Sequence, residues 1–156
     1  MRSRYCYVYG IGIVTIIIDQ LTKWLIASSV PLWSGFSVIP DFFNIVHVLN
    51  RGAAFGFLNS TDTTWQVWMF SGAAIIACAA IHLMARSANY NKVLFSALGL
   101  ILGGAVGNLI DRVLNGAVTD FLDFYYASYH WPAFNVADIA ICIGAALMLF
   151  TLRDIK

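Results

Sequence analysis

Long apolar runs separated by short polar segments dominate the pattern of this chain. The first run extends from about residue 5 to residue 30 and is interrupted by Asp19, Gln20 and Lys23. An apolar stretch of about 20 residues can cross the hydrocarbon core of a bilayer as an α-helix. The first run is longer than the apolar region of a secretory signal peptide, about 7–15 residues, so we expect its helix to be retained. The pattern predicts an all-α membrane protein, one domain over residues 1–156, with four transmembrane helices at about residues 8–28, 65–85, 93–113 and 134–152.

Between residues 31 and 64 the apolar pattern breaks at prolines and glycines. Two short β-branched or aromatic pieces, residues 36–39 and 43–49, are bounded by turn residues and are too short to span a bilayer. They predict a small β-rich element with interfacial segments on the outer face of the membrane. Aromatic side chains suited to the headgroup region accompany it, namely Trp33, Phe42, Phe43 and those of residues 125–131.

Composition supports a membrane environment. The chain is 60% hydrophobic and only 11% charged, with a mean hydropathy of +0.77, whereas soluble proteins have about 25% charged residues. The net charge of +1 gives no reason to expect a nucleic-acid partner. Cys6, Cys78 and Cys142 show no metal-ligand or disulfide spacing, so we expect neither a metal nor another cofactor.

Basic residues predict the topology. Those that flank one side of the four expected spans are Arg2, Arg4, Arg86, Lys92, Arg153 and Lys156. Under the positive-inside rule both termini then lie in the cytoplasm, and residues 31–64 and 115–133 lie outside. Polar residues from several separate segments meet at the outer face in this arrangement: Asp19, Asn50, Arg51, Asp111, Asp120 and Asp138.

Residues 103–121 place polar side chains in one of the most apolar parts of the chain. These side chains are Asn108, Asp111, Arg112 and Asp120. Placing an ionisable group at membrane depth costs free energy, and such groups normally face protein or water. We therefore interpret this segment as a candidate functional site. A charge-assisted interaction of Asp111 with the adjacent Arg112 would make Asp111 a scaffold.

The other polar residues have structural interpretations beside functional ones. Asp19 and Lys23 share a helix face at i, i+4 and form either an anchoring ion pair or part of a site. Asn50 and Arg51, followed by a glycine, would alone be explained by an ordinary turn. Asn135 is suited to cap the last helix, which puts Asp138 at its third position, where an acid stabilises a helix.

Taken together, the polar segments resemble the five ordered motifs of lipoprotein signal peptidase, the bacterial signal peptidase II family. The motifs are Asp19-Gln-Leu-Thr-Lys23, Asn50-Arg-Gly-Ala-Ala-Phe55, Gly103-Gly-Ala-Val-Gly-Asn-Leu-Ile-Asp-Arg112, Val118-Thr-Asp-Phe121 and Phe134-Asn-Val-Ala-Asp138. The resemblance implies an aspartyl endopeptidase of the bacterial inner membrane. Such an enzyme removes the signal peptide from lipid-modified prolipoproteins, cutting just before the diacylglyceryl-modified cysteine. We expect a monomer in contact with membrane lipid.

Roles follow from the resemblance motif by motif. It implies that Asp120 and Asp138 are the catalytic pair. Polar support and substrate contacts would come from Asp19, Lys23, Asn50, Arg51, Asn108, Asp111, Arg112 and Asn135. Thr119 departs from the family, which commonly has valine there, and Asp123 adds a nearby acid that we interpret as solvated or interfacial.

The chemistry of two paired carboxylates agrees with these roles. Two such groups cannot both ionise cheaply, so one keeps a proton while the other acts as a base, as in aspartic proteases. Judged from the residues alone, two other functional classes stay open. In a small transporter the aspartates would line an ion pathway, which an internal repeat would favour, and none is evident. A purely structural subunit would leave the outer-face polar residues unexplained.

Overall fold

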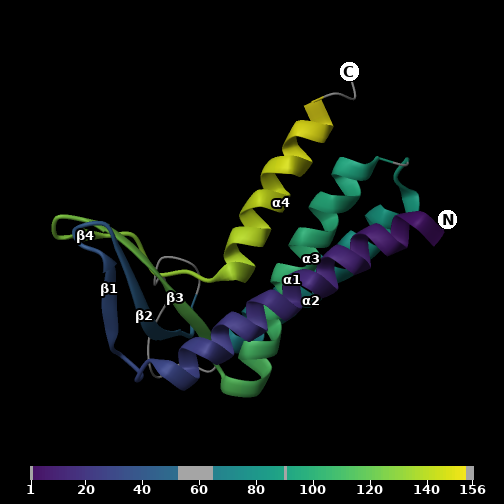
Figure 1. Cartoon of the computed structure of the whole chain (residues 1–156). Helices are drawn as coiled ribbons and strands as arrows, with labels where there is room; N and C mark the ends of the chain where they lie inside the picture. Colours follow the sequence, from purple (N-terminus) through teal and green to yellow (C-terminus); the bar gives the residue numbers. More distant parts are fainter. Residues whose placement is uncertain (1, 53–64, 90, 154–156) are drawn as a thin grey trace. The chain divides into compact units, whose positions relative to one another are not determined.

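The computed structural model of the chain describes residues 2–52, 65–89 and 91–153. The described elements follow in the order α1 (Arg2–Ser29), β1 (Gly35–Ile39), β2 (Phe43–Asn50), α2 (Trp65–Ser87), α3 (Lys92–Asn115), β3 (Val118–Tyr126), β4 (Tyr129–His130) and α4 (Val136–Arg153) (Figure 1). Residues 53–64 lie outside the described part, and with them the end of the Asn50–Phe55 motif. The described chain is mostly helical with a small antiparallel sheet, which confirms the predicted class in outline.

Each of the four expected spans overlaps a helix, although α4 begins at Val136, two residues after the start of the span expected at about residues 134–152. Among the described residues, three segments are long and apolar enough to cross a membrane, Tyr5–Ser29, Trp65–Ser87 and Lys92–Asn115. The apolar part of α4, Val136–Thr151, is shorter. Local capping sets the ends of α3, because the Asn91 Oδ1 accepts bonds from two backbone N–H groups of its first turn and Gly116, at φ +68°, follows its last residue.

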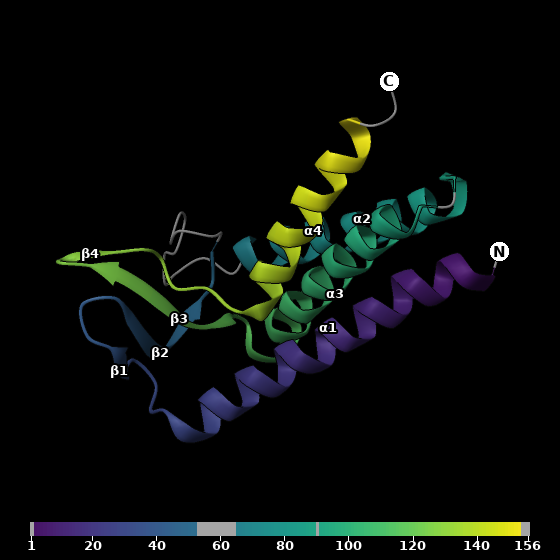
Figure 2. The same ribbon diagram turned by 45° about the horizontal axis from the view of Figure 1, so that its top comes forward.

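The described chain divides into two compact units. The first consists of Met1–Asp19, Gly72–Asn108 and Val136–Lys156, and the second of Gln20–Ser71 and Leu109–Asn135. Within the first unit α1 and α3 run side by side, as Figure 2 shows. This unit therefore has its own helix packing, which the glycines of α3 explain.

Glycines at a four-residue spacing let α3 approach α1 closely. A Cβ atom on Gly99 would come within 2.8 Å of the Val8 carbonyl oxygen, and one on Gly103 within 2.5 Å of the Thr15 Cβ. Gly104 faces α4, where a Cβ atom would lie 2.4 Å from the Ala137 carbonyl oxygen. Small residues at helix contacts are a common device of membrane proteins. These glycines are therefore positions of close helix packing, covered by neighbouring helices.

Gly104→Ala is expected to destabilise the protein, because the added methyl group meets backbone that cannot move aside. We expect a loss of about 1–3 kcal/mol of unfolding free energy, the usual cost of overpacking. Thermal unfolding in detergent micelles measures it. Gly72→Ala is the matched control, since a Cβ atom there meets nothing within 4 Å. Equal unfolding temperatures for Gly104→Ala and the unchanged protein would contradict the packing described here.

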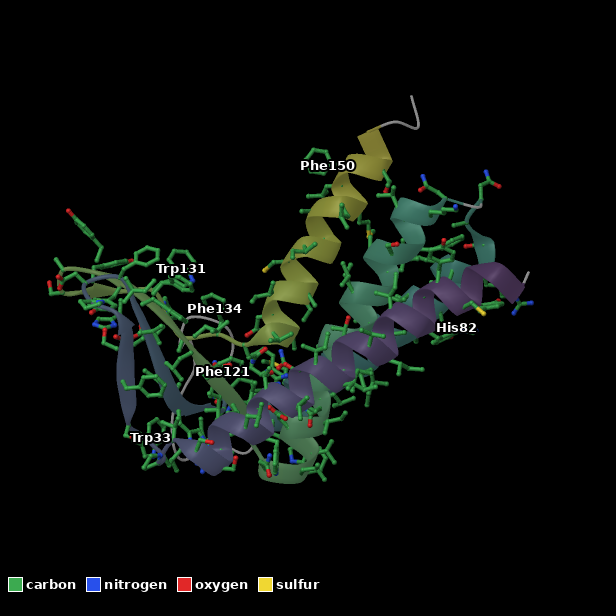
Figure 3. The ribbon with its side chains drawn as sticks, in the orientation of Figure 1. Trp33, His82, Phe121, Trp131, Phe134 and Phe150 are labelled. Atoms are coloured by element: carbon green, nitrogen blue, oxygen red, sulfur yellow. The ribbon has the colours of Figure 1, made fainter. Side chains whose placement is uncertain are left out.

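The buried core of the first unit is small, and much apolar surface stays exposed. The buried cluster consists of Val8, Ile81, Ala85, Phe95 and Leu98. In contrast, Ile76 on α2 is 71% exposed and Phe150, labelled on α4 in Figure 3, is 66% exposed. A water-soluble helix would bury its apolar stripe. The exposed apolar side chains therefore suit helices surrounded by lipid.

The second unit contains an antiparallel sheet in the strand order β1-β2-β3-β4. The rings of Phe43 and Phe124 stack at 4.7 Å between centroids, and Phe134 stacks on Phe124 at 5.9 Å. Strands β1 and β2 confirm the β-rich element predicted between residues 31 and 64. Strand β3 was not foreseen, although its β-branched and aromatic residues are typical of a strand.

All five tryptophans of the chain belong to the second unit, and each is exposed. They are Trp24, Trp33, Trp65, Trp68 and Trp131, two of which are labelled in Figure 3. Tryptophan side chains favour the boundary between hydrocarbon and water, where an apolar ring and a polar N–H are both satisfied. Their clustering in one unit is the pattern expected of a part that lies at a membrane surface.

Candidate active site

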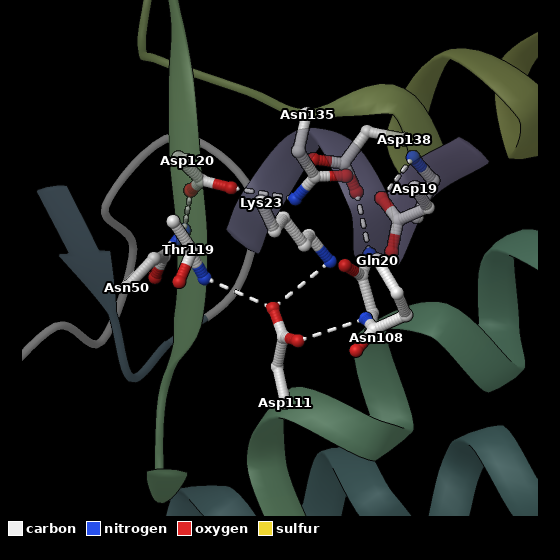
Figure 4. A network of polar contacts seen from close by, with 11 residues as sticks. Asp19, Gln20, Lys23, Asn50, Asn108, Asp111, Thr119, Asp120, Asn135 and Asp138 are labelled. Atoms are coloured by element: carbon white, nitrogen blue, oxygen red, sulfur yellow. Dashed lines mark hydrogen bonds and ion pairs between the residues drawn. The ribbon is translucent and has the colours of Figure 1, made fainter. Parts of the chain in front are cut away.

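Strand β3 carries Asp120, whose carboxylate is held by two side-chain amides (Figure 4). Asn135 Nδ2 donates to its Oδ1 at 2.7 Å, and Asn50 Nδ2 donates to its Oδ2 at 3.0 Å. The Asn50 amide is itself oriented, because its Oδ1 accepts a bond from the Gly52 N–H at 3.0 Å. Asp120 is only 2% exposed. A buried carboxylate with a donor on each oxygen is held in a single orientation.

The sheet explains why these two asparagines reach Asp120. Asn50 ends β2, which pairs with β3 so that Asn50 lies opposite Val118. The segment that follows β4 returns alongside β3, where Phe134 exchanges backbone hydrogen bonds with Leu122. Asn135 is the next residue. One donor therefore comes from each side of the strand that carries Asp120.

Asp111, near the end of α3, joins three elements of the second unit. Its Oδ2 forms an ion pair with the Lys23 Nζ at 2.9 Å and accepts the Thr119 N–H at 3.1 Å, while its Oδ1 accepts from the Gln20 Nε2 at 3.0 Å. Asp111 is 3% exposed and Lys23 is 4% exposed. Because Thr119 precedes Asp120, this contact ties strand β3 to α1 and α3. The scaffold role of Asp111 stays a prediction, and these contacts support it.

The cation that holds Asp111 is different from the one expected. Lys23 pairs with Asp111, whereas the Arg112 guanidinium lies over the Phe70 ring at 5.3 Å. Adjacent residues on a helix point in different directions, so Asp111 and Arg112 are poorly placed to pair with each other. The alternative of an Asp19–Lys23 pair stays a prediction. Arg51 is exposed, and its contribution also stays a prediction.

In the first unit Asp138 lies in the first turn of α4, at the third helical position predicted for it. Its Oδ1 accepts a hydrogen bond from the Asn108 Nδ2 at 2.8 Å (Figure 4). Asn108 is 6% exposed, and Asp138 is half-buried. The amide of a buried α3 residue thus orients the second candidate carboxylate.

Asp19 caps the helix that carries Asp138. Its Oδ1 accepts the Ala137 N–H at 2.9 Å, and its side chain is fully buried. A carboxylate there satisfies an amide that the helix leaves unpaired and interacts well with the helix dipole. Gly107 makes room for it, since a Cβ atom on Gly107 would be 2.6 Å from the Asp19 Oδ2. This cap supports the position of Asp138.

Three features of the site were missed or misread from the sequence. Asn135 precedes α4 as expected of an N-cap, and its side-chain nitrogen donates to Asp120, while the bond that Asp19 accepts from the first turn of α4 was not foreseen. Gln20 was not selected, although a polar residue inside an apolar run was a signal. Of the two interpretations of Asp123, the solvated acid is wrong, because Asp123 is 7% exposed and accepts a bond from Asn44, whereas the interfacial position stays a prediction. Pairing of β2 with β3 sets those two residues opposite each other.

Comparison with known protein families shows which family this chain belongs to. Residues 11–153 match the model of the family described as signal peptidase (SPase) II. The chain belongs to the signal peptidase II family. It is therefore a peptidase, and its family accounts for the five motifs whose residues form the contacts described above.

Relatives from several bacteria agree over nearly the full length. The chain is 57% identical to the lipoprotein signal peptidase of Oleidesulfovibrio alaskensis over 145 residues, 93% of each chain. It is 56% identical to that of Maridesulfovibrio salexigens, covering 94% of this chain and 95% of the relative. The enzyme of Yersinia pestis is 45% identical over 141 residues.

Solved structures agree as well. A bacterial membrane enzyme has a TM-score of 0.81 with this chain at 37% identity, covering 92% of this chain and 85% of its own. A second structure of a bacterial membrane enzyme gives a TM-score of 0.80 at 37% identity. The fold of this chain is thus that of a bacterial membrane enzyme.

Proposed function

We propose that this chain is an aspartyl endopeptidase that removes the signal peptide from prolipoproteins, with Asp120 and Asp138 as the catalytic pair. It cuts before the diacylglyceryl-modified cysteine. The observation that carries the proposal is the environment of Asp120, a buried carboxylate with an amide donor on each oxygen in a chain of the signal peptidase II family. A membrane peptidase needs such an oriented base.

The covalent chain supports the pairing of the two aspartates. Asn135 donates to Asp120 and stands three residues before Asp138. Three residues span at most about 11 Å even when fully extended. The chain therefore keeps Asp138 close to Asn135, the residue that donates a hydrogen bond to Asp120.

In the proposed reaction Asp120 is the ionised member and Asp138 carries the shared proton. Each oxygen of Asp120 accepts an amide hydrogen bond, which orients its carboxylate to act as the base. Asp120 takes a proton from a water molecule as the water oxygen bonds to the scissile carbonyl carbon, and Asp138 protonates the carbonyl oxygen. Asp120 then gives its proton to the leaving nitrogen. The C–N bond breaks, the carbonyl re-forms and its proton returns to Asp138, which leaves the pair as it began.

The remaining motif residues act around this pair. Asn50, Asn108 and Asn135 orient the carboxylates, and Asp19 supports the helix of Asp138. Lys23 and Asp111 hold the strand of Asp120 in place. Arg51 and Arg112 supply positive charge for contacts with the substrate or with lipid headgroups. No step of this scheme needs a metal or another cofactor.

We propose that the enzyme is a monomer in the bacterial inner membrane, one integral domain with four transmembrane helices and both termini in the cytoplasm. The second unit then lies at the outer face. The exposed tryptophans of that unit support this placement, as does the exposed apolar surface of the helices. Helix α4 has 18 residues, and a helix of this length extends about 27 Å, close to the thickness of the hydrocarbon core.

Cleavage of a purified prolipoprotein tests the function. The enzyme is expected to release the signal peptide from precursor that carries the diacylglyceryl group and to leave unmodified precursor intact. It should remain active in strong chelator and after treatment with serine-protease reagents, because an aspartyl pair activates water without a metal ion and without a nucleophilic serine. Loss of activity in chelator that zinc restores would replace the aspartyl mechanism by a metal-dependent one. Equal cleavage of both precursors would show that the lipid is not recognised.

Labelling of single cysteines in intact membranes tests the topology. A cysteine that replaces Asn89, between α2 and α3, is expected to react only after reagents reach the cytoplasmic side, because Arg86 and Lys92 flank it. A cysteine at Ser37 on β1 should react from the outer side. The background for both is a variant in which Cys6, Cys78 and Cys142 are replaced by alanine. Labelling of the residue 89 cysteine from outside alone would reverse the proposed topology.

A further inference from the structure

A second polar cluster in the sheet unit contains Asp123, whose carboxylate the proposed reaction does not use. Asn44 Nδ2 donates to its Oδ2 at 2.8 Å. The His130 Nδ1–H donates to the same carboxylate, at 2.9 Å from Oδ1 and 3.0 Å from Oδ2. The carboxylate is 10% exposed and the imidazole 53% exposed. The pair thus joins β3 to β4 through a hydrogen bond that becomes an ion pair whenever His130 is protonated.

His130 stands at the start of the segment that delivers Asn135 to Asp120. After His130, the Trp131 N–H donates to the Phe124 carbonyl at 2.7 Å. Further along, the Phe134 N–H donates to the Leu122 carbonyl at 3.1 Å. The five residues that follow His130 therefore run back along β3 and end at the amide that orients the carboxylate of Asp120.

We propose that Asp123 and His130 are positioning residues for Asp120. The pair anchors the beginning of the return segment, residues 131–135. Asn135, at the end of this segment, then keeps the Asp120 carboxylate in the orientation that activates water. The inference rests on the proposed catalytic role of Asp120. The side chains of Asp123 and Asp120 use different partners, Asn44 and His130 for the former and Asn50 and Asn135 for the latter. Asp123 therefore acts through the return segment.

A cavity of about 420 Å³ gives solvent access to this cluster. Its lining includes Asp123, His130, Asn44, Trp33 and Phe36. The His130 ring also stacks on the Tyr125 ring, with centroids 4.9 Å apart and planes 7° apart. Removal of the imidazole would leave a slot between an aromatic face and a carboxylate. Free imidazole has the shape and the N–H donor to occupy that slot.

The test compares single-turnover cleavage of a lipidated precursor by the full-length enzyme and its variants. His130→Ala and Asp123→Ala are each expected to lower the rate at saturating enzyme about tenfold, with precursor binding nearly unchanged, since a misplaced catalytic group costs rate more than affinity. The double variant should lose no more than the stronger single one. Asp123→Asn should stay active, because Asn accepts from Asn44 and donates to the other tautomer of His130. Added imidazole should restore part of the rate of His130→Ala.

The controls separate positioning from folding and from the catalytic assignment. His82→Ala removes a histidine bonded to Tyr9 in the other unit and is expected to cleave at the normal rate with no response to imidazole. A normal rate for His130→Ala, or a loss confined to precursor binding, would overturn the inference. So would a lower rate that accompanies lower thermal stability and does not respond to imidazole. Asp120→Asn in the same assay tests the proposed function separately, because full activity of that variant would remove the residue being positioned.

Discussion

Asp120→Asn and Asp138→Asn are each expected to lower the single-turnover rate of precursor cleavage by at least about a thousandfold. Asparagine keeps the shape of the side chain but cannot take up and release the proton that each step requires. Binding of the precursor and folding should change little. At Asp120 one of the two amide donors loses its acceptor, and at Asp138 the first turn of α4 loses an acid, so a small loss of stability is expected at each position.

The losses of cleavage rate in the two single variants, Asp120→Asn and Asp138→Asn, should not be additive. The aspartates act as one unit, so a variant with both substitutions is expected to be about as slow as either single variant. Asp123→Asn, an isosteric change of another buried aspartate on the same strand, keeps that residue's hydrogen bonds and should cleave the precursor. A dead Asp123→Asn beside an active Asp120→Asn would show that the pair is misassigned. Normal cleavage by both Asp120→Asn and Asp138→Asn would end the aspartyl protease proposal.

Asp111→Asn is expected to cause the largest loss of stability, about 3–5 kcal/mol of unfolding free energy. The substitution leaves the buried Lys23 ammonium without the carboxylate that it contacts at 2.9 Å. The polar contacts to Gln20 and to the Thr119 N–H depend on the same carboxylate. Equilibrium unfolding in detergent micelles measures the effect. Activity should fall along with stability, because Thr119 is next to Asp120.

A double substitution tests whether the buried ammonium of Lys23, once it has lost the Asp111 carboxylate, causes this loss. Lys23→Met together with Asp111→Leu removes both charged groups and should be more stable than Asp111→Asn alone, since the buried ammonium is gone. Asp41→Asn, an exposed aspartate in the turn between β1 and β2, is the control and should unfold normally. If Asp111→Asn and Asp41→Asn unfolded alike, Asp111 would not be a scaffold.

Local pattern was enough to predict the helices and most of the residues now found in contact. Runs of apolar residues longer than about 20 positions determine helices in a membrane, because a backbone in lipid must satisfy its own hydrogen bonds. The same lipid makes a polar side chain costly, so Asn108, Asp111 and Asp120 stood out before their partners were known. Helical spacing also placed Asp138 in the first turn of the last helix.

Tertiary structure decided which polar groups meet. Spacing within a helix shows that Asp19 and Lys23 share a face, but it could not show that Asp19 also caps α4 or that Lys23 also pairs with Asp111. Likewise, the sequence allowed Asp123 to be solvated or interfacial, and the register of β2 with β3 buries it opposite Asn44. A short segment of sequence specifies local geometry, whereas a hydrogen bond between distant segments depends on how closely their surfaces pack. That distance is set here by the glycines of α3 and by strand pairing.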